Sequence, residues 1–325
     1  MTSLRWGLLS TARINRALIP AIRAGARSEL VAVASREADR ATEYARQWDI
    51  PQAFGSYEAM LADPSTNAIY ISLPNHLHVE WTIKAVRAGK HVLCEKPMAL
   101  DPNDVDRVAE AATAAGVVVT EAFMYRHHAQ THRILALLDE GAVGELRLVR
   151  GCFSFLLTRD DDVRLKPEWG GGSLWDVGCY PVSYARLVMG AEPVAVSGLS
   201  ERGPTGIDLA FCGALQFPGG RLATFDCGFR AAFRTFMEFV GTEASLEAPN
   251  PFKPGPHEHL RLVREGMATT IDVQGAALYS GEVEDLESAA LDGRAPAVSL
   301  ADTRGNVAVL SALYQSAAAK VDITT

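Results

Sequence analysis

Short apolar runs alternate with amphipathic segments through the first 120 residues, and this alternation limits the possible folds more than any other feature. Helical patterns lie at residues 14–24, 38–48, 76–88 and 103–115. The apolar runs predict strands at residues 4–9, 30–34, 68–73, 91–94 and 117–120. Apolar strands that alternate with helices are typical of a parallel sheet covered by helices on both faces. We therefore expect an α/β chain that begins with a doubly wound parallel sheet.

The pattern changes after residue 120. A helix is predicted at residues 130–138, and strands are predicted at 146–156, 208–217, 221–229, 236–240 and 244–247. The segment Phe217-Pro218-Gly219-Gly220-Arg221 has the composition of a hairpin turn between two of these strands. These features predict a C-terminal α+β domain with a large, mostly antiparallel sheet.

The length of 325 residues and the hydrophobic content of 48% allow two cores and exceed one ordinary domain. We predict a dinucleotide-binding domain over residues 1–122 and a substrate-binding and oligomerisation domain over residues 123–325. A C-terminal helix, expected at about 302–318, should pack on a core, and the first domain is one candidate for it. Because one face of an antiparallel sheet often needs a cover, we expect a homodimer or homotetramer that associates through the C-terminal sheet.

Composition narrows the choice of partners. The net charge of -8 is spread along the chain, and the longest like-charge run is Asp160-Asp161-Asp162, which argues against nucleic acid. No apolar run approaches the roughly 20 residues that a membrane span needs. The chain enters a strand-like segment directly after Met1, without a basic region before an apolar stretch. We expect a cytoplasmic protein with small-molecule partners.

Cysteine and histidine spacing indicates no metal site. The five cysteines lack a C-x-x-C pair and lie mostly in apolar runs, which predicts buried, reduced thiols. His76 and His78 are two residues apart and His127 and His128 are adjacent, so neither pair has the i, i+4 spacing of helical zinc ligands. We expect no metal ion, and we place His127 and His128 on a helix surface.

The turn between the first strand and the first helix suits a pyrophosphate. Ser10 and Ala12 stand at the first two glycine positions of a Rossmann G-x-G-x-x-G turn and are small enough for main-chain N–H groups to approach phosphate. Neither has the freedom of glycine at positive φ. The residues assigned to this part of the cofactor site are Ser10, Thr11, Ala12, Arg13 and Ile14. The alternative is an ordinary tight turn.

The end of the second strand indicates which dinucleotide binds. An NAD-binding domain usually has an acidic residue there for the ribose 2′-hydroxyl, whereas this chain has Ser35 and Arg36, which suit a 2′-phosphate. Arg40, one helical turn further on, can contribute to the same pocket. NADP is therefore the expected cofactor and NAD the less favoured one, unless Arg36 is an ordinary solvated residue at the start of a helix.

Two further segments follow predicted parallel strands, where open α/β sheets bind ligands. One contains Leu73, Pro74, Asn75 and His78, and the other is Glu95-Lys96-Pro97. We assign Glu95, Lys96 and the four residues of the first segment to the cofactor site. His78 is a candidate for contact with the nicotinamide ribose and Asn75 for contact with the adjoining main chain, although a histidine there is as often just partly buried.

Together with residues 121–126 and 170–180, these motifs resemble the Gfo/Idh/MocA family of NAD(P)-dependent oxidoreductases, and the likeness covers most of the chain. In that family the lysine of Glu-Lys-Pro is catalytic, which implies Lys96. The later motif implies Asp176 and, four residues further on, Tyr180. Most members have histidine at this last position, so the tyrosine implies a subgroup of NADP-dependent sugar and dihydrodiol dehydrogenases.

These residues predict a mechanism. A phenol has a pKa of about 10, and a neighbouring ammonium lowers that pKa toward neutral pH. We expect Lys96 to act on Tyr180 in this way, and Tyr180 to exchange a proton with a secondary alcohol or carbonyl during hydride transfer. Asp176 is expected to hold a neighbouring substrate hydroxyl or the lysine. The structural alternatives are a solvated lysine and a core tyrosine before a helix that Pro181 begins.

Four more residues are candidates for a pocket that takes a sugar, a polyol or a related cyclic diol: Tyr125, Arg126, Arg164 and Trp169. Trp169 offers a flat apolar face for a sugar ring. For each of the four, a structural role is at least an equal alternative. Three other functions stay open: a nucleotide-sugar ketoreductase, a non-catalytic cofactor-binding regulatory protein, and a hydrolase that uses nicotinamide transiently.

Overall fold

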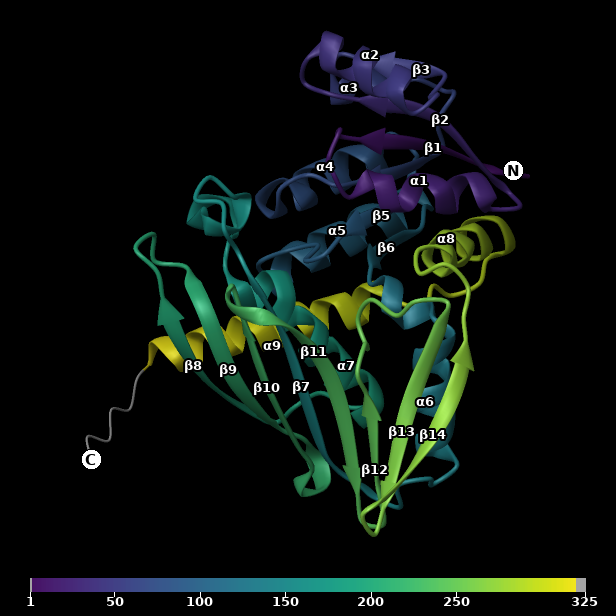
Figure 1. Ribbon diagram of the computed structural model, residues 1–325. Helices are drawn as coiled ribbons and strands as arrows, with labels where there is room; N and C mark the ends of the chain where they lie inside the picture. The colour runs from purple at the N-terminus through teal and green to yellow at the C-terminus, as the bar shows by residue number, and fades with distance from the viewer. Residues whose placement is uncertain (1, 320–325) are drawn as a thin grey trace. The chain divides into compact units, whose positions relative to one another are not determined.

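The computed structural model describes residues 2–319. By their internal contacts these residues form two compact units (Figure 1). The first unit ends at His127 and also contains Ala276–Arg304, whereas the second contains His128–Gly275 and continues from Gly305. The single boundary predicted after residue 122 leaves out this return of the chain to the first unit. As a statement about domains, that boundary stays a prediction.

A six-stranded parallel sheet forms the centre of the first unit, in the order β3-β2-β1-β4-β5-β6. Its strands are β1 Leu4–Leu9, β2 Ser28–Ala34, β3 Gln52–Phe54, β4 Ala68–Ile71, β5 His91–Glu95 and β6 Val119–Ala122. The strand order reverses at β1, which confirms the predicted doubly wound sheet. The sequence pattern does not predict β3, because this edge strand has only three residues.

Helices cover both faces of this sheet. They are α1 Asn15–Ala24, α2 Ala38–Gln47, α3 Tyr57–Ala62, α4 His78–Arg87, α5 Pro102–Ala115 and α8 Ser280–Asp292. Alternate strand residues separate two cores, because Leu8 and Tyr70 pack with α1 and α8, whereas Leu9 and Ile71 pack with α3, α4 and α5. The sequence pattern does not predict α8, although α8 supplies Val283 to the first of these cores.

An eight-stranded sheet forms the centre of the second unit, in the order β14-β13-β12-β11-β7-β10-β9-β8. Neighbouring strands are antiparallel except β7 and β10, so the predicted mostly antiparallel sheet is confirmed. The strands are β7 Leu146–Leu156, β8 Ala195–Arg202, β9 Asp208–Gln216, β10 Leu222–Gly228, β11 Arg230–Gly241, β12 Ser245–Ala248, β13 His257–Arg264 and β14 Met267–Gln274. The pattern does not predict β8, β13 or β14, because most of their residues are exposed or half-buried.

The turn predicted at residues 217–221 joins β9 to β10. Gly219 and Gly220 have φ values of 77° and 75°, a left-handed conformation that glycine adopts without a Cβ penalty. Leu222 then pairs with Gln216, which sets the register of the hairpin. The predicted hairpin is therefore confirmed.

Helices line one face of the eight-stranded sheet. α6 Ala129–Asp139 packs on β14, α7 Cys179–Met189 packs on β7, and α9 Leu300–Ala318 brings Leu313 against glycines of β8 and β9. From Gly305 onward α9 belongs to this unit, whereas its first residues belong to the first unit. Packing of the predicted helix on the first domain stays a prediction. Within residues 2–319, no helix is both long and apolar enough to cross a membrane.

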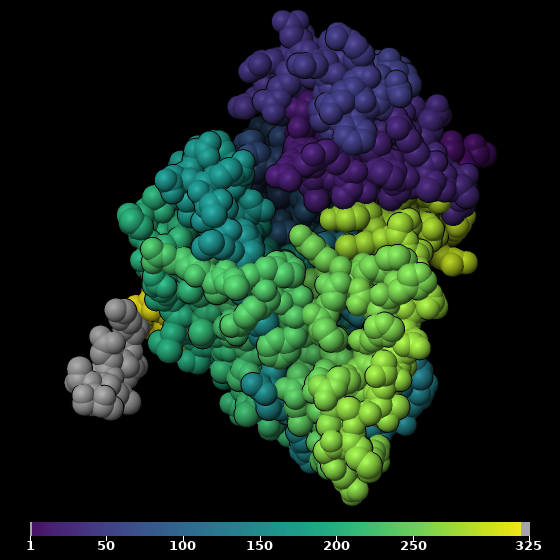
Figure 2. All heavy atoms as spheres, viewed as in Figure 1, coloured from purple at the N-terminus to yellow at the C-terminus, as the bar shows by residue number. Residues whose placement is uncertain are grey.

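The opposite face of this sheet is exposed, and residues 208–274 form the green to yellow-green surface in Figure 2. Ion pairs between neighbouring strands cover part of this face, as between Arg150 and Glu238. Cys212 lies on it between Phe211 and Gly213, which are buried, because successive strand residues point to opposite faces. The prediction of buried cysteines is therefore wrong for Cys212 and confirmed for the other four.

Candidate active site

The turn between β1 and α1 holds a serine in a conformation that usually requires glycine. Ser10 has a φ of 144°, which is unusual for a residue with a Cβ. Its hydroxyl oxygen accepts a hydrogen bond from Ala12 N (3.1 Å) and lies 2.8 Å from Ser72 Oγ. These bonds offset part of the strain, so serine can stand at the first glycine position of the turn.

Asn15 and Ser72 tie this turn to the end of β4. Asn15 is fully buried, donates from Nδ2 to Ser10 O (2.8 Å), and accepts at Oδ1 from Ser72 Oγ (2.7 Å). Arg13 and Ile14 directly precede α1, which has neither a side-chain cap nor an acidic residue in its first turn. The N-terminal N–H groups of α1 therefore suit a phosphate. No sequence pattern marks Asn15 or Ser72, because their role depends on contacts between distant segments.

Arg40 contacts the same turn, and Arg36 lies with it near the phenol of Tyr57. Arg40 Nε donates to Thr11 Oγ1 (2.8 Å). Burial raises the pKa of Tyr57, and the positive charges of Arg36 and Arg40 oppose this increase, so both guanidinium groups lie near its phenol. Ser35 is buried, but both arginines are exposed, and neither has a carboxylate partner within residues 2–319. Two converging, unpaired guanidinium groups suit a phosphate.

His78 joins the loop after β4 to the loop after β5. The loop after β4 runs through Pro74 into a short helix, Asn75–Leu77. His78 is 1% exposed, and its Nδ1 lies 2.8 Å from Pro97 O while its Nε2 lies 2.6 Å from Leu73 O. Both ring nitrogens therefore face main-chain carbonyls, and contact of His78 with the nicotinamide ribose stays a prediction.

We expect acid to destabilise the protein through His78. Burial lowers the pKa of His78 from 6.5 to about 4, so below pH 6.5 the unfolded chain binds a proton that the folded protein does not. Stability is lost as pH falls from 6.5 toward 4, and the loss at pH 5 is about 2 kcal/mol. His78→Gln should therefore gain about this much relative to wild type between pH 7.5 and pH 5, measured by urea unfolding.

The control is His259→Gln, because His259 is exposed and lies beside Asp272 on the surface. That variant should follow the wild-type pH dependence closely. If the free energies of unfolding of His78→Gln and wild type changed with pH in parallel, the pKa of His78 in the folded protein would have its ordinary value.

Glu95 fixes the segment that contains Lys96. One carboxylate oxygen of Glu95 accepts from Tyr70 OH (2.5 Å), and the other accepts from Lys96 N (3.3 Å). A second carboxylate, that of Glu121, accepts from Met98 N (2.8 Å). The main chain of the Glu-Lys-Pro segment is therefore held at the end of β5, and Lys96 is half-buried there.

Asp208 anchors the glycine-rich segment of the second unit. Its carboxylate accepts from Ser173 Oγ (2.6 Å), Leu174 N (2.7 Å) and Tyr314 OH (2.6 Å). Burial raises the pKa of Asp208, and these donors oppose the increase. Gly172 leaves room for the network, because a Cβ at this position would overlap Asp208 Oδ1. Sequence reasoning misses Asp208 and Tyr314, since they lie far along the chain from the motif.

A single π-helical turn, Leu174–Gly178, follows this anchor and leads directly into α7. Asp176 in this turn accepts from Arg164 Nε (2.6 Å), and Arg164 also pairs with Asp162 (3.1 Å). The negative charge of Asp176 raises the pKa of Arg164, so the guanidinium stays charged. The structure therefore joins two predicted site residues, while contact of Asp176 with substrate or lysine stays a prediction.

Tyr180 is the second residue of α7 and is 4% exposed. Its ring packs against Phe153 and Phe252, with centroid distances of 5.4 Å to each. The helix begins two residues before Pro181, so this proline lies in the first turn of α7, where proline is tolerated, and does not begin the helix. The ring of Tyr180 is thus held by aromatic neighbours. Its approach to Lys96 stays a prediction.

The remaining predicted substrate residues are divided between the two units. In the first unit, Arg126 pairs with Asp302 (2.8 Å), and Tyr125 is fully buried. In the second unit, Lys166 Nζ lies 4.1 Å from the centre of the Trp169 ring, so an ammonium covers one face of the indole. Each of the three residues thus has a structural environment of its own, and substrate contact stays a prediction for all of them.

The prediction that His128 lies on a helix surface is wrong. It is buried, and its Nδ1 accepts from Gln130 N (3.1 Å) at the start of α6, where it caps the helix. In the part of the chain that the structure describes, no group of three or more His, Cys, Asp or Glu side chains is arranged to hold a metal ion.

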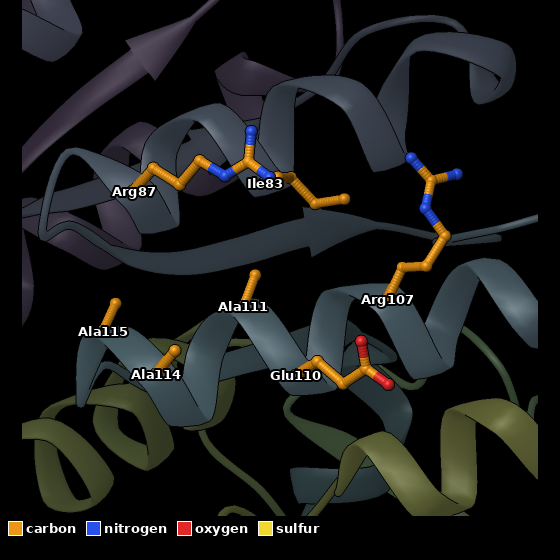
Figure 3. A pocket seen from close by; sticks show the side chains of 7 residues that line it. All are labelled: Ile83, Arg87, Arg107, Glu110, Ala111, Ala114 and Ala115. Carbon is orange, nitrogen blue, oxygen red and sulfur yellow. The ribbon is translucent and has the colours of Figure 1, made fainter.

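A groove of about 600 Å³ lies between α4 and α5 (Figure 3). Short apolar side chains and three charged ones line it: Ile83, Arg87, Arg107, Glu110, Ala111, Ala114 and Ala115. None of the predicted site residues is among them. The groove is therefore distinct from the loops after β1, β2, β4 and β5 that carry the candidate cofactor residues.

The first unit has an uncapped helix N-terminus after β1, two arginines after β2 and, after β5, a lysine whose main chain is held by Glu95. These features, and the motif segment of the second unit, are those predicted for the class of NAD(P)-dependent oxidoreductases. Residues 4–123 match the oxidoreductase family with an NAD-binding Rossmann fold, and residues 131–247 match the GFO/IDH/MocA C-terminal domain. The chain belongs to the Gfo/Idh/MocA family of dehydrogenases and reductases, as the sequence resemblance implied.

Two relatives and one solved structure agree with this assignment. The chain is 36% identical to D-xylose 1-dehydrogenase (NADP(+)) 2 of Haloferax volcanii, over 96% of this chain and 97% of the relative. It is 34% identical to trans-1,2-dihydrobenzene-1,2-diol dehydrogenase of Bos taurus, over 77% of this chain and 75% of the relative. A 3-ketoreductase from Actinomadura kijaniata, in complex with NADP and TDP-benzene, is similar in structure, with a TM-score of 0.92, 29% identity and coverage of 97% of this chain and 98% of that one.

Proposed function

We propose that this protein is an NADP-dependent oxidoreductase that acts on a secondary alcohol or carbonyl of a sugar, a polyol or a related cyclic diol. The observation that carries the proposal is the anchoring of both motif segments by carboxylates, one half-buried and one buried. Glu95 holds the main chain of Lys96, and Asp208 holds the start of the segment that contains Asp176 and Tyr180. Such anchoring is expected where side chains must be positioned for chemistry.

The residues of the first unit fit NADP. The N-terminus of α1 suits the pyrophosphate, and Arg36 and Arg40 suit the 2′-phosphate. Bound NADP would supply or accept the hydride. The protein's own task is then to bind the substrate and to move one proton.

Tyr180 is the proposed general acid and base. In the oxidation direction it accepts the proton of the substrate hydroxyl, and in reduction it donates a proton to the forming alkoxide. Lys96 stabilises the phenolate by its positive charge. Asp176 lies in the π-helical turn, and its ion pair with Arg164 holds its carboxylate in place. The Asp176 carboxylate then accepts a hydrogen bond from a second substrate hydroxyl.

The substrate class is tested with a panel of aldoses, inositols, dihydrodiols and keto sugars. Absorbance of NADPH and of NADH is followed in parallel for each compound. Turnover of a sugar or diol with NADP supports the proposal. A protein that binds NADPH but turns over none of the panel would instead be a non-catalytic regulator, and substrate cleavage without net change in NADPH would indicate the transient use of nicotinamide by a hydrolase.

A nucleotide-sugar ketoreductase is the second candidate. It is favoured by the similar structure of the 3-ketoreductase that holds NADP and TDP-benzene. A nucleoside-diphosphate keto sugar included in the panel separates the two functions. Preference for this compound over the corresponding unattached sugar would select the second candidate.

Replacing Arg36 by aspartate is expected to move cofactor preference from NADP toward NAD. The change removes a charge-assisted hydrogen bond to the 2′-phosphate and adds a like charge, so the ratio of kcat/KM for NADP over NAD should fall by about a hundredfold. Steady-state kinetics with both cofactors measure this ratio. Arg46→Asp is the matched control, because Arg46 is exposed in the last turn of α2, the helix that begins two residues after Arg36. An unchanged ratio in Arg36→Asp would remove this residue from the cofactor site.

We also propose that copies of the chain associate through the exposed face of the eight-stranded sheet. Apolar side chains interrupt the charged residues of that face, since Leu199 is 76% exposed and Leu222 is 47% exposed. Sedimentation of wild type and of Leu199→Glu tests the proposal, with a smaller species expected for the variant. Equal sedimentation would argue for another interface or for a monomer.

A further inference from the structure

Glu282 is a buried acid that has no hydrogen-bond partner among residues 2–319. It lies in the first turn of α8, is 1% exposed, and both of its carboxyl oxygens are buried without a donor or acceptor in reach. An ionised carboxylate in such a place would lose its hydration with nothing in return, which is far more costly than burial of the neutral acid. Burial accordingly raises the pKa of Glu282, and the negative charge of Glu95 raises it further.

Glu95 is the second carboxyl of this cluster, and its environment is the opposite one. It accepts from Tyr70 OH and from Lys96 N, so it has the donors that an ionised carboxylate needs. Tyr70 and Tyr279 complete the cluster, because the pKa of each is raised by burial and then by the charges of Glu95 and Glu282. Tyr70 lies in β4, and Glu95 lies at the end of β5. Tyr279 directly precedes α8, and Glu282 lies in the first turn of that helix.

Two causes act on the pKa of Glu282, burial and the negative charge of Glu95, and no cation is among them. The short helix Met124–His127 packs against α8, where a Cβ on Gly281 would touch the His127 side chain. Glu282 is buried and Glu95 is half-buried, and of these two acids only Glu95 has donors among residues 2–319. A single proton shared by the pair therefore belongs on Glu282.

We propose that Glu282 is a positioning residue for Lys96, which it serves by carrying a proton beside the Glu95 carboxylate. Because Glu282 is neutral, Glu95 is the one negative charge of the pair and keeps its bond to the Lys96 main chain. Loss of the Glu282 proton would place two negative charges side by side, and Glu95 would have to move or take up a proton of its own. The inference rests on the proposed catalytic role of Lys96.

Infrared spectroscopy tests the protonation without any substrate. In the full-length protein at pH 8, a band of a protonated carboxylic acid that shifts in D₂O should be present in wild type and missing from Glu282→Gln. Glu287→Gln is the matched control, because Glu287 is a buried acid of the same helix whose carboxylate accepts from Ser28 Oγ and Arg27 N. The spectrum of Glu287→Gln should keep the band. A wild-type spectrum identical to that of Glu282→Gln in this region would overturn the inference.

The pH profile of kcat/KM tests the positioning. Where one protonated group is required, activity falls about tenfold for each pH unit above its pKa. Wild type should show such an alkaline decline, and Glu282→Gln should lack it, because its neutral amide cannot ionise. Should the glutamine variant fail to fold, Glu282→Met provides a second neutral side chain for both measurements. An alkaline decline unchanged in the variant would refute the positioning role.

The two measurements also separate this inference from the proposed function. The infrared band depends on Glu282 alone and is present whether or not any substrate is turned over. Hydride transfer without the band would refute the proton on Glu282 and leave the proposed function in place. The band without turnover of any substrate would refute the proposed function.

Discussion

Replacement of Tyr180 by phenylalanine is expected to lower kcat/KM by about a thousandfold, because general acid–base catalysis commonly contributes between about 10² and 10⁴. The substitution removes only the hydroxyl. Phe153 and Phe252 pack against the ring, which phenylalanine keeps, so the fold around α7 should persist. The measurement is steady-state kinetics with the best substrate of the panel, together with NADPH binding by fluorescence titration, which should not change.

Tyr184→Phe is the matched control for this experiment. Tyr184 lies one turn further along α7, is fully buried, and its hydroxyl donates to Thr131 Oγ1 (3.3 Å). Loss of that bond should cost about 1 kcal/mol of stability and leave the proton transfer intact. Full activity in Tyr180→Phe would exclude Tyr180 as the acid and base. An equal loss of activity in both variants would point to packing as the cause.

Replacement of Gly172 by alanine is expected to disrupt the whole segment that leads to Tyr180. Gly172 has a φ of 124°, and an added Cβ would overlap Asp208 Oδ1 and approach Tyr314 OH to 2.7 Å. Backbone strain and the loss of charge-assisted hydrogen bonds together should cost about 3 kcal/mol or more. We expect Tm to fall by roughly 6 °C or more, and kcat to fall at temperatures where the protein is still folded.

The control is Gly190→Ala, at the C-terminal end of α7. Gly190 also has a positive φ of 59°, but no atom lies within 4 Å of an added Cβ. Its substitution should therefore cost only the left-handed backbone penalty of about 1 kcal/mol and should not change kcat. A Gly172→Ala variant no less stable than Gly190→Ala would show that the Asp208 network does not hold the motif.

The strands and helices that the sequence predicts are those whose apolar pattern is strong. β1 and β7 match their predicted bounds, because their residues form clear apolar or alternating runs. The sequence pattern does not predict β13 and β14, because few of their residues are buried. It also does not predict α8, although Leu286 of this helix packs on the first sheet. A pattern reports burial along one element, and it is weak where burial is slight or where the covering element returns from far along the chain.

The motif residues were recognisable from order and spacing, but the groups that hold them were not. Glu95 and Lys96 are adjacent in sequence, whereas Tyr70, which donates to Glu95, comes from another strand. Asp208 and Ser173 are 35 positions apart and meet only in the folded second unit. Spacing along the chain carries no signal for such pairs.

The amino-acid sequence by itself determined the family, the doubly wound sheet and the identity of the proton-transfer candidates, because side-chain chemistry and apolar periodicity are properties of order along the chain. Only the tertiary structure decided that His78 joins two loops, that Asp176 pairs with Arg164, and that Glu282 is buried without a donor. The reason is that burial and hydrogen bonding depend on which distant residues meet. Those meetings in turn set the protonation and position of the groups that the sequence supplies.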